Sequence, residues 1–416
     1  MGAAVLGAGL VTACSTTGAA GSDSTNQSSS GGAAASAPGV TPTTITLGAL
    51  LALTGTFAAG AKAQLAGAQL YWNDINANGG VCDGRTVKIT ARDHEYDPQK
   101  AVTAYSDIHD DILGIQLLTG TPMTEAVADQ MAQETVSAIP MSWSPDLLGK
   151  DSILVPGTTY DIDMVNAVDY LVKDGTLADG NSIGYVYFQG DFGGPGLKGA
   201  EFAAKKHNIT VKSFQVDPSV TDLSSQVSEM AKDGVKAIFM SVSPPMLANA
   251  AAVSHTQGLD VPIVVPSPTY VPELLSSSAA EQVAARVMVV SSYNAWTADT
   301  PGLQKLRDQY KKSGEKSDPQ QFFIAGYAAA SMMHAALDSA CSKGALTRES
   351  LKDAFANVKS FAMDGLSVDL SYHDRKAPAS LSDYILHADK DAVGGLKPVT
   401  DTPFQGEDAQ AFLASK

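Results

Sequence analysis

The feature that most constrains this chain is a regular alternation of short apolar runs with amphipathic segments from Thr44 onward. Short apolar runs are typical of buried strands, and the segments between them place apolar residues at helical spacing. Strands that alternate with helices of about 10–15 residues predict βαβ units and parallel sheets with helices on both faces. The predicted fold class is therefore α/β.

The alternation falls into two successive runs, which predict two domains. In the first run we expect strands at 45–51, 87–91, 112–118 and 138–141, and helices at 60–78, 98–111 and 123–134. The pattern restarts after Val155. There we expect helices at 161–173, 196–207, 222–232 and 245–257, and strands at 182–188, 210–216, 235–241 and 262–265.

The last part of the chain has too few strands to enclose a third core. We expect strands at 287–291, 366–370 and 384–387, and helices at 302–311, 322–340 and 347–357. Helices without their own sheet must pack on an existing one. We therefore expect this part to complete the two earlier domains, so that the chain crosses between them more than once.

The N-terminus indicates export and lipidation. Residues 11–14 read Val-Thr-Ala-Cys and resemble a bacterial lipobox, in which a peptidase cuts before a cysteine that then carries lipid. We expect a signal peptide at 1–13, lipid on Cys14 and a flexible Ser/Gly/Ala-rich tether at 14–39. Signal peptides begin with a basic region, whereas the first basic residue here is Lys62, so we expect the true start to lie upstream. A flexible tail with an incidental cysteine is the alternative.

Charge and hydropathy exclude several classes of partner. The 28 Lys and Arg residues and 44 Asp and Glu residues give a formal net charge of −16. Nucleic-acid affinity comes largely from basic side chains, and an acidic surface is also repelled by anionic lipid. No apolar run reaches the roughly 20 residues of a membrane-spanning helix. We therefore expect no nucleic-acid partner, and membrane attachment at the outer face of the cell membrane through the lipid alone.

Two cysteines remain after Cys14. Cys82 and Cys341 are 259 positions apart. A pair of cysteines in an exported protein is often a disulfide, and two unrelated buried thiols are the alternative.

Enzymatic alternatives find limited support. The segment 194–199 (GPGLKG) matches the GxGxxG pattern of dinucleotide-binding folds, and Asp217 follows 18 residues later. However, residues 189–193 separate it from the preceding strand, and Pro195 lacks an N–H where pyrophosphate would bind. A nucleotide-dependent enzyme stays as an alternative, and an absorbance spectrum would detect its cofactor.

Other chemistry is absent from the sequence. It contains no HExxH, and we interpret the cluster of Asp93, His94, Glu95 and Asp97 as a solvated loop. We therefore expect no catalytic residues, no cofactor and no metal.

Several motifs, taken in order, resemble the leucine/isoleucine/valine-type solute-binding proteins. They are Leu53-Thr54-Gly55, residues 72–81 (WNDINANGGV), Asp93 with Asp97-Pro98 and Ala101, residues 139–142 (IPMS), and Asp191-Phe192-Gly193 with Gly196-Leu197. The resemblance covers 40 to about 392. It implies a type I periplasmic-binding-protein fold, with two doubly wound parallel-sheet lobes, a three-segment hinge and a ligand in the cleft. Lobe one would be 40–160 plus 291–368, and lobe two 161–290 plus 369–416.

The resemblance also implies a function. A protein of this family is the extracytoplasmic receptor of an ABC importer, and this chain would act as a monomer that hands a small organic solute to a membrane permease. The solute would be an amino acid, a carboxylate, an amide or an aromatic compound. A ligand sensor of the same fold is the alternative. The lobe assignment places Cys82 and Cys341 in lobe one, each just after a helix end, which favours the disulfide.

Ligands of open α/β sheets bind beyond the C-terminal ends of the strands. The resemblance implies that the loops after residues 118 and 141 hold a carboxylate through hydroxyls and backbone N–H groups. The predicted ligand-binding residues are Phe57, Thr121, Ser142, Trp143, Ser144, Tyr160, Phe192, Ser243 and Thr269. Thr121 could instead cap a helix, and Trp143 could instead be a core residue.

Two features of the predicted cleft suggest the kind of solute. We expect Trp143 and Phe192 to face each other across the lobes and to enclose the body of the ligand. Family members that bind α-amino acids place an acidic residue near the last loop of lobe two, whereas this chain has Pro268 and Thr269, with no acid before Glu273. A buried ammonium group without a carboxylate partner is costly. The sequence therefore predicts an uncharged or acidic solute with an apolar or aromatic body.

Overall fold

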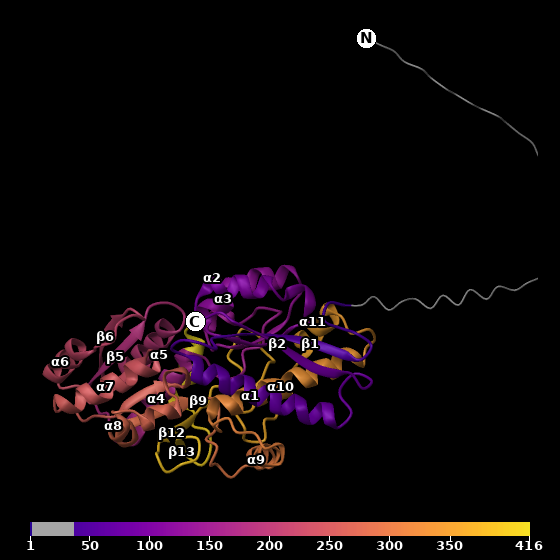
Figure 1. The fold of residues 1–416 in the computed structure, drawn as a ribbon. Helices are drawn as coiled ribbons and strands as arrows, with labels where there is room; N and C mark the ends of the chain where they lie inside the picture. The colour runs from indigo at the N-terminus through magenta and orange to yellow at the C-terminus, as the bar shows by residue number, and fades with distance from the viewer. Residues whose placement is uncertain (2–36) are drawn as a thin grey trace, which may run out of the picture. The chain divides into compact units, whose positions relative to one another are not determined.

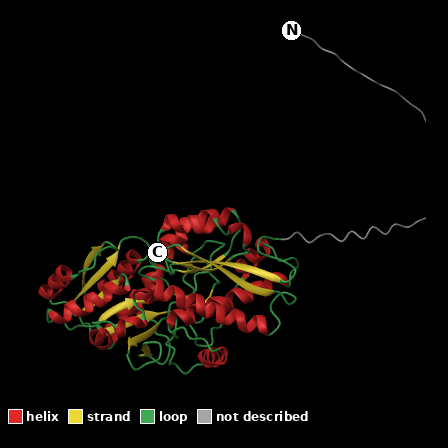
Figure 2. Ribbon diagram, in the orientation of Figure 1, coloured by secondary structure: helices red, strands yellow, loops and turns green. Residues whose placement is uncertain are grey.

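Strands and helices alternate along the chain as the sequence predicts. The structure is a computed structural model that describes Met1 and residues 37–416. Figure 2 shows strands flanked by helices throughout this part of the chain. Cys14, the predicted signal peptide and nearly all of the predicted tether lie outside the described residues.

Lobe one is built around a parallel sheet of four strands in the order β2–β1–β3–β4. The strands are β1 (Thr44–Leu51), β2 (Thr86–Asp93), β3 (Ile115–Thr119) and β4 (Ala138–Met141). Every residue of β3 and β4 is buried, which explains why both strands are continuously apolar. We use "lobe one" for the part of the chain around this sheet.

Helices from both ends of the sequence cover this sheet. The early ones are α1 (Ala58–Ala77), α2 (Pro98–Ser106) and α3 (Thr121–Gln133), and the late ones are α9 (Pro301–Ser313), α10 (Gln321–Cys341) and α11 (Arg348–Asn357). Figure 1 shows the orange helix α10 beside the indigo α1, and α11 packs on α10. The late helices therefore complete an early domain, as predicted.

Lobe two surrounds a sheet of seven strands in the order β13–β12–β9–β8–β7–β5–β6. They are β5 (Ser182–Phe188), β6 (Thr210–Val216), β7 (Ala237–Ser241), β8 (Ile263–Pro266), β9 (Val287–Ser291), β12 (Tyr384–Ala388) and β13 (Leu396–Pro398). The helices are α4 (Tyr160–Lys173), α5 (Gly193–Lys206), α6 (Ser224–Asp233), α7 (Pro244–Thr256), α8 (Ala280–Arg286) and α12 (Glu407–Ala414). β12 pairs antiparallel with β9 and with β13, and the strands β9, β8, β7, β5 and β6 pair in parallel.

The chain passes between the sheets after β4, after β9 and before β12, and these three segments contact one another. The backbone N–H of Thr158 donates to the Ser292 hydroxyl at 3.0 Å, and the N–H of Val368 donates to the Ser292 carbonyl at 2.9 Å. The N–H of Ala379 donates to the carbonyl of Gly157 at 3.1 Å. The predicted three-segment connection is present, while the exact lobe boundaries stay a prediction.

Some predicted elements differ in extent. Helix 98–111 ends at Ser106 and is followed by a 3₁₀ turn at His109–Asp111, because acidic residues are unfavourable at a helix C-terminus. The strand expected at 112–118 begins at Ile115. The strand expected at 366–370 shrinks to β11 (Leu370–Ser371), paired with β10 (Ser360–Phe361). The sequence reading missed the short elements β10, β13, α8 and α12.

The glycine-rich segment 194–199 lies inside α5 rather than in a loop before it. A Cβ atom on Gly199 would lie 2.0 Å from the carbonyl oxygen of Asp161, so glycine allows α5 to approach α4 closely. The phosphate-binding loop of the dinucleotide alternative is therefore not formed.

The predicted disulfide is present in the structure. Cys82 and Cys341 are bonded, with their Cα atoms 5.6 Å apart. The bond joins the turn before β2 to the last residue of α10. Within the described part of the chain, no helix is long and apolar enough to cross a membrane.

Candidate functional site

A cavity with an empty volume of about 480 Å³ lies between the two lobes, next to the C-terminal ends of β3 and β4. Most of the side chains that line the cavity are apolar or aromatic, and none carries a charge. The lining residues are Phe57, Gly60, Ala61, Gln64, Tyr96, Thr119, Gly120, Thr121, Met141, Trp143, Tyr160, Phe192, Pro268, Val271 and Phe322.

The polar part of the lining is at the start of α3. Gly120 has a φ of 93°, and a Cβ atom there would lie 2.2 Å from Cε of Met123, so only glycine fits this turn. The Thr121 hydroxyl is 2.6 Å from the Ser142 hydroxyl. The first turn of α3 has no acidic residue and no side-chain cap. Uncapped N–H groups and the helix dipole favour a negatively charged or polar ligand group at this end.

Three aromatic rings form a continuous wall that includes residues of both lobes. The Tyr160 ring is edge-on to Trp143, with centroids 6.2 Å apart, and edge-on to Phe192, with centroids 5.1 Å apart. Tyr160 begins α4, and Phe192 immediately precedes α5. Tyr160 thus lies between Trp143 and Phe192, the two rings that we expected from the sequence to face each other directly. That Trp143 and Phe192 enclose a ligand stays a prediction.

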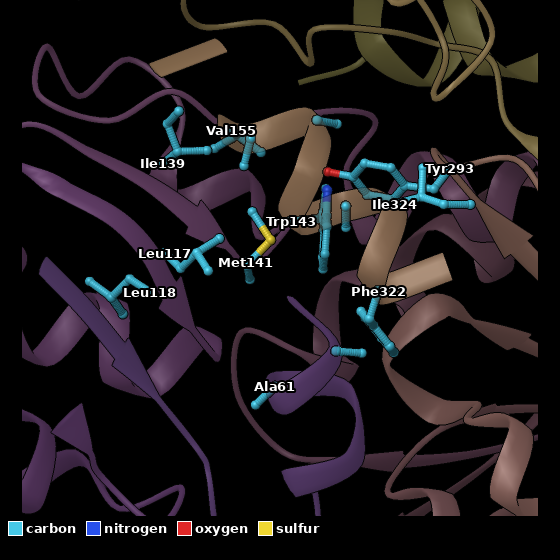
Figure 3. Close-up of a cluster of buried hydrophobic side chains, with 14 of the residues drawn as sticks. Ala61, Leu117, Leu118, Ile139, Met141, Trp143, Val155, Tyr293, Phe322 and Ile324 are labelled. Carbon is cyan, nitrogen blue, oxygen red and sulfur yellow. The ribbon is translucent and has the colours of Figure 1, made fainter. Parts of the chain in front are cut away.

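Trp143 belongs both to the cavity wall and to the core. It lines the cavity, yet only 4% of its surface is exposed. Figure 3 shows its indole nitrogen directed toward the hydroxyl end of Tyr293, with Met141, Phe322 and Ala61 around the rest of the space. Trp143 is therefore both a core residue and part of the cavity wall, so the two alternatives that the sequence left open both apply.

Tyr96 is a lining residue that sequence reasoning missed. Its ring contacts the Phe57 ring, with centroids 4.3 Å apart and a tilt of 36° between the ring planes. Glu95 and Tyr96 both have positive φ, 53° and 61°. Such backbone is uncommon outside glycine and costs of order 1–3 kcal/mol per residue. This turn directs the Tyr96 side chain toward the cavity, and no sequence motif predicts the turn.

The acidic loop around Tyr96 has a structural role. Asp93 accepts hydrogen bonds from the N–H groups of Leu53 and Glu95, and Asp97 caps the N-terminus of α2. His94 is fully buried. The expectation of a solvated loop was therefore wrong for His94, because the loop closes over the end of β1.

The two cleft tyrosines are protonated donors over the whole physiological range. Burial raises the pKa of the Tyr96 hydroxyl, and the nearby Tyr160 adds to the effect. Burial also raises the pKa of the Tyr160 hydroxyl, partly offset by hydrogen bonding with the Trp143 backbone and with the Thr121 and Ser142 side chains. The hydroxyls of Thr121, Ser142 and Tyr160 therefore form one neutral polar group beside the uncapped start of α3.

The predicted residues fall into two groups. Those that line the cavity are Phe57, Thr121, Trp143, Tyr160 and Phe192, with Ser142 bonded directly behind Thr121. Ser144, Ser243 and Thr269 are buried but do not line it.

Two of the three residues that do not line the cavity form hydrogen bonds with backbone groups instead. The Ser144 hydroxyl accepts from the N–H of Asp146, and the Thr269 hydroxyl donates to the carbonyl of Val242 at 2.8 Å. Ser243 precedes α7. Strand-end position therefore predicted residues that lie in and around this cavity, but not which hydroxyls line it.

Comparison with known proteins identifies the family of this chain. A profile described as periplasmic binding protein matches residues 44–391. The chain belongs to the periplasmic binding protein family. No curated protein sequence matched the chain.

Solved structures of the family extend this result. A fatty acid ABC transporter substrate-binding protein from Thermomonospora curvata is 35% identical, with a TM-score of 0.87, over 91% of this chain and 96% of that one. A branched-chain amino acid ABC transporter protein from Thermus thermophilus with bound valine is 19% identical, with a TM-score of 0.74, over 88% and 98%. The second likeness concerns the fold alone.

Membership in the family establishes the class of protein to which this chain belongs. The chain is a substrate-binding protein of the ABC-transporter type, an extracytoplasmic class that binds small solutes. It is therefore a binding protein and not an enzyme. The type I fold inferred from sequence motifs is confirmed.

Proposed function

We propose that this periplasmic binding protein is a receptor for a fatty acid or a related carboxylate with an apolar chain. The observation that carries the proposal is the lining of the cavity, in which no charged side chain is present and aromatic and aliphatic groups dominate. An α-amino acid would leave its ammonium group without a carboxylate partner. The 35% identity to a protein named as a fatty acid transporter component supports the same choice.

The carboxylate of such a solute has a natural place in the cavity. Thr121 and Tyr160 line the wall next to the uncapped start of α3, with Ser142 behind Thr121. Hydroxyl and backbone N–H donors stabilise a carboxylate without a cationic side chain. The chain of the solute would then lie against Phe57, Met141 and Phe322, among the apolar lining residues.

We further propose that the protein acts as a monomer at the outer face of the cell membrane. Lipid on Cys14 and a tether at 14–39 would hold it there, and it would deliver its solute to a membrane permease. The support for the anchor is the lipobox-like sequence at 11–14.

The test is a calorimetric titration of the delipidated, refolded protein with straight-chain carboxylates of increasing length. Each methylene buried contributes roughly 0.8 kcal/mol, so we expect about a fourfold gain in affinity per added carbon until the cavity is full. Alkylamines of equal length should bind much more weakly. Nanomolar binding of leucine, isoleucine or valine, or affinity independent of chain length, would refute the proposal.

A pair of variants tests the place of the carboxylate. Ser142→Ala removes a hydroxyl from the polar group, and we expect about tenfold weaker binding of carboxylates. Ser137→Ala is the matched control, because Ser137 is also fully buried in lobe one but its hydroxyl has no hydrogen-bond partner among the described residues. Equal affinities for the two variants would place the carboxylate elsewhere.

A further inference from the structure

An imidazole and two carboxylates lie close together in lobe two, at the C-terminal end of α5. This is the end of α5 that is away from the cavity. His207 caps the C-terminal end of α5, Asp169 lies in α4, and Asp408 lies in the first turn of α12. The Nε2 atom of His207 is 3.1 Å from Oδ1 of Asp169 and 3.3 Å from Oδ2 of Asp408. One ligand atom from each side chain lies within 4.8 Å of the other two.

Hydrogen bonding within the protein leaves this group incomplete. Nε2 of His207 is hydrogen-bonded to Asp169, and the second oxygen of Asp169 accepts from the backbone N–H of Asp408 at 2.9 Å. Oδ2 of Asp408 is shielded from solvent, and no described residue donates a hydrogen bond to it. A single imidazole N–H cannot point at both carboxylates at once. A buried acceptor without a donor requires an explanation.

A cation at the centre of the three atoms supplies that explanation. Zinc binds imidazole nitrogen and carboxylate oxygen at about 2.0–2.2 Å, which in a tetrahedral site separates the ligand atoms by about 3.3–3.6 Å. The distances from His207 Nε2 to the two carboxylates are 3.1 and 3.3 Å, at or just below this range. The donor set of one imidazole and two carboxylates suits zinc better than calcium or magnesium, which prefer oxygen alone.

The surroundings provide access and charge. A cavity with an empty volume of about 670 Å³ borders the cluster and is lined by Asp169, His207, Gln405 and Glu407 among others. Glu407 adds a third carboxylate, against the single cation of Lys173. Asp169 is 6% exposed, and its carboxylate lies in one cluster with that of Asp408. A divalent cation would relieve this repulsion.

We propose that Asp169, His207 and Asp408 form a zinc-binding site that fastens the C-terminal helix α12 to α4 and α5. The site is separate from the solute cavity, since the two share no lining residue. Its role would be to stabilise the C-terminal segment of lobe two. This proposal does not depend on the identity of the solute.

Zinc titration of the full chain tests the site, with the protein purified without a polyhistidine tag and treated with a chelator. All forms carry Cys14→Ser, which removes a thiol ligand outside the described residues. We expect one zinc ion per chain by equilibrium dialysis and a rise in melting temperature. His207→Gln and Asp408→Asn should each weaken zinc binding at least tenfold.

His255→Gln is the matched control. His255 is also paired with an aspartate, Asp260, at 2.9 Å, but it has no second carboxylate. Circular dichroism of each variant verifies that it is folded, and Asp408→Asn keeps the backbone N–H that contacts Asp169. No saturable zinc binding, or equal binding by His207→Gln and wild type, would mean that a protonated His207 merely pairs with two acids. Zinc binding lost in Asp191→Asn instead would place the ion at the separate acidic cluster of Glu125, Asp146 and Asp191.

Discussion

The indole N–H of Trp143 donates to the carbonyl oxygen of Pro156 at 3.3 Å, and the hydroxyl of Tyr293 donates to the same oxygen at 3.2 Å. Pro156 and Tyr293 belong to two of the three segments that connect the lobes. Trp143 therefore joins the cavity wall to the connecting segments through one side chain. If ligand binding moves this ring, the hydrogen bond to Pro156 would transmit the movement to the segments that connect the lobes.

Trp143→Phe is expected to weaken binding of the carboxylate ligand about tenfold. The variant loses ring area in the cavity wall together with the hydrogen bond to Pro156. Because Trp143 is 4% exposed, the unliganded protein should also lose about 1–3 kcal/mol of unfolding free energy. Calorimetry and urea unfolding measure the two effects.

Fluorescence provides the control for this variant. Ligand addition should shift the tryptophan emission of the wild type and of Trp296→Phe, but not of Trp143→Phe. Trp296 is also buried, but it packs on Tyr310 and Phe323 and does not line the cavity. A shift that survives in Trp143→Phe would contradict the assignment of Trp143 to the wall.

Reduction of the Cys82–Cys341 bond is expected to destabilise the protein without changing the solute site. The bond closes a loop with a sequence separation of 259 residues, and disulfides typically contribute about 2–4 kcal/mol. The paired variant Cys82→Ser, Cys341→Ser should melt at a lower temperature and keep its ligand affinity. Two alkylatable thiols in the native, unreduced protein would show that the bond does not form.

The alternation of strands and helices predicted the fold because sheets of parallel strands need continuous apolar runs and covering helices. It failed for β13 and α12, which are short and whose burial depends on contacts with distant elements. The site was partly predictable for a related reason: parallel strands bring their C-terminal ends to one edge, and Thr121 and Trp143 follow β3 and β4 there. Phe322 was missed because it lies in the first turn of α10, 181 residues after Met141, and only tertiary packing turns it toward the cavity.

Cys14→Ala should release the protein from the membrane fraction when it is expressed with a functional signal sequence. The physical reason is that the acyl chains on Cys14 would be the whole of the attachment. Fractionation with immunoblotting measures the distribution. Wild-type levels of the variant in the membrane fraction would contradict the lipid anchor, and Ser15→Ala serves as the neutral control.

The connecting segments contain a pair of buried acids that should make stability depend on pH. The Thr158 hydroxyl lies 2.6 Å from Oδ1 of Asp163 and 2.7 Å from Oδ1 of Asp383, and it has one proton to donate. Burial raises the pKa of Asp383 to about 6. Burial and the charge of Asp383 raise the pKa of Asp163 as well. Asp161 adds a nearby negative charge, which Lys416 partly offsets through a 2.6 Å ion pair.

The sign of the effect follows from proton binding. The folded pair holds a proton at a pH where the unfolded carboxyls, with pKa values near 4, have already lost it. Unfolding therefore releases a proton, and the free energy of unfolding falls as pH rises from about 4 through 6, by at most about 1.4 kcal/mol per pH unit for one proton. Asp163→Asn removes one of the two titrations while keeping the shape of the side chain, so its unfolding free energy should fall less steeply between pH 4 and 7. Urea unfolding across this range measures the slopes, with the exposed Asp129→Asn as control, and a slope for Asp163→Asn equal to that of the wild type would show that the pair does not hold the proton.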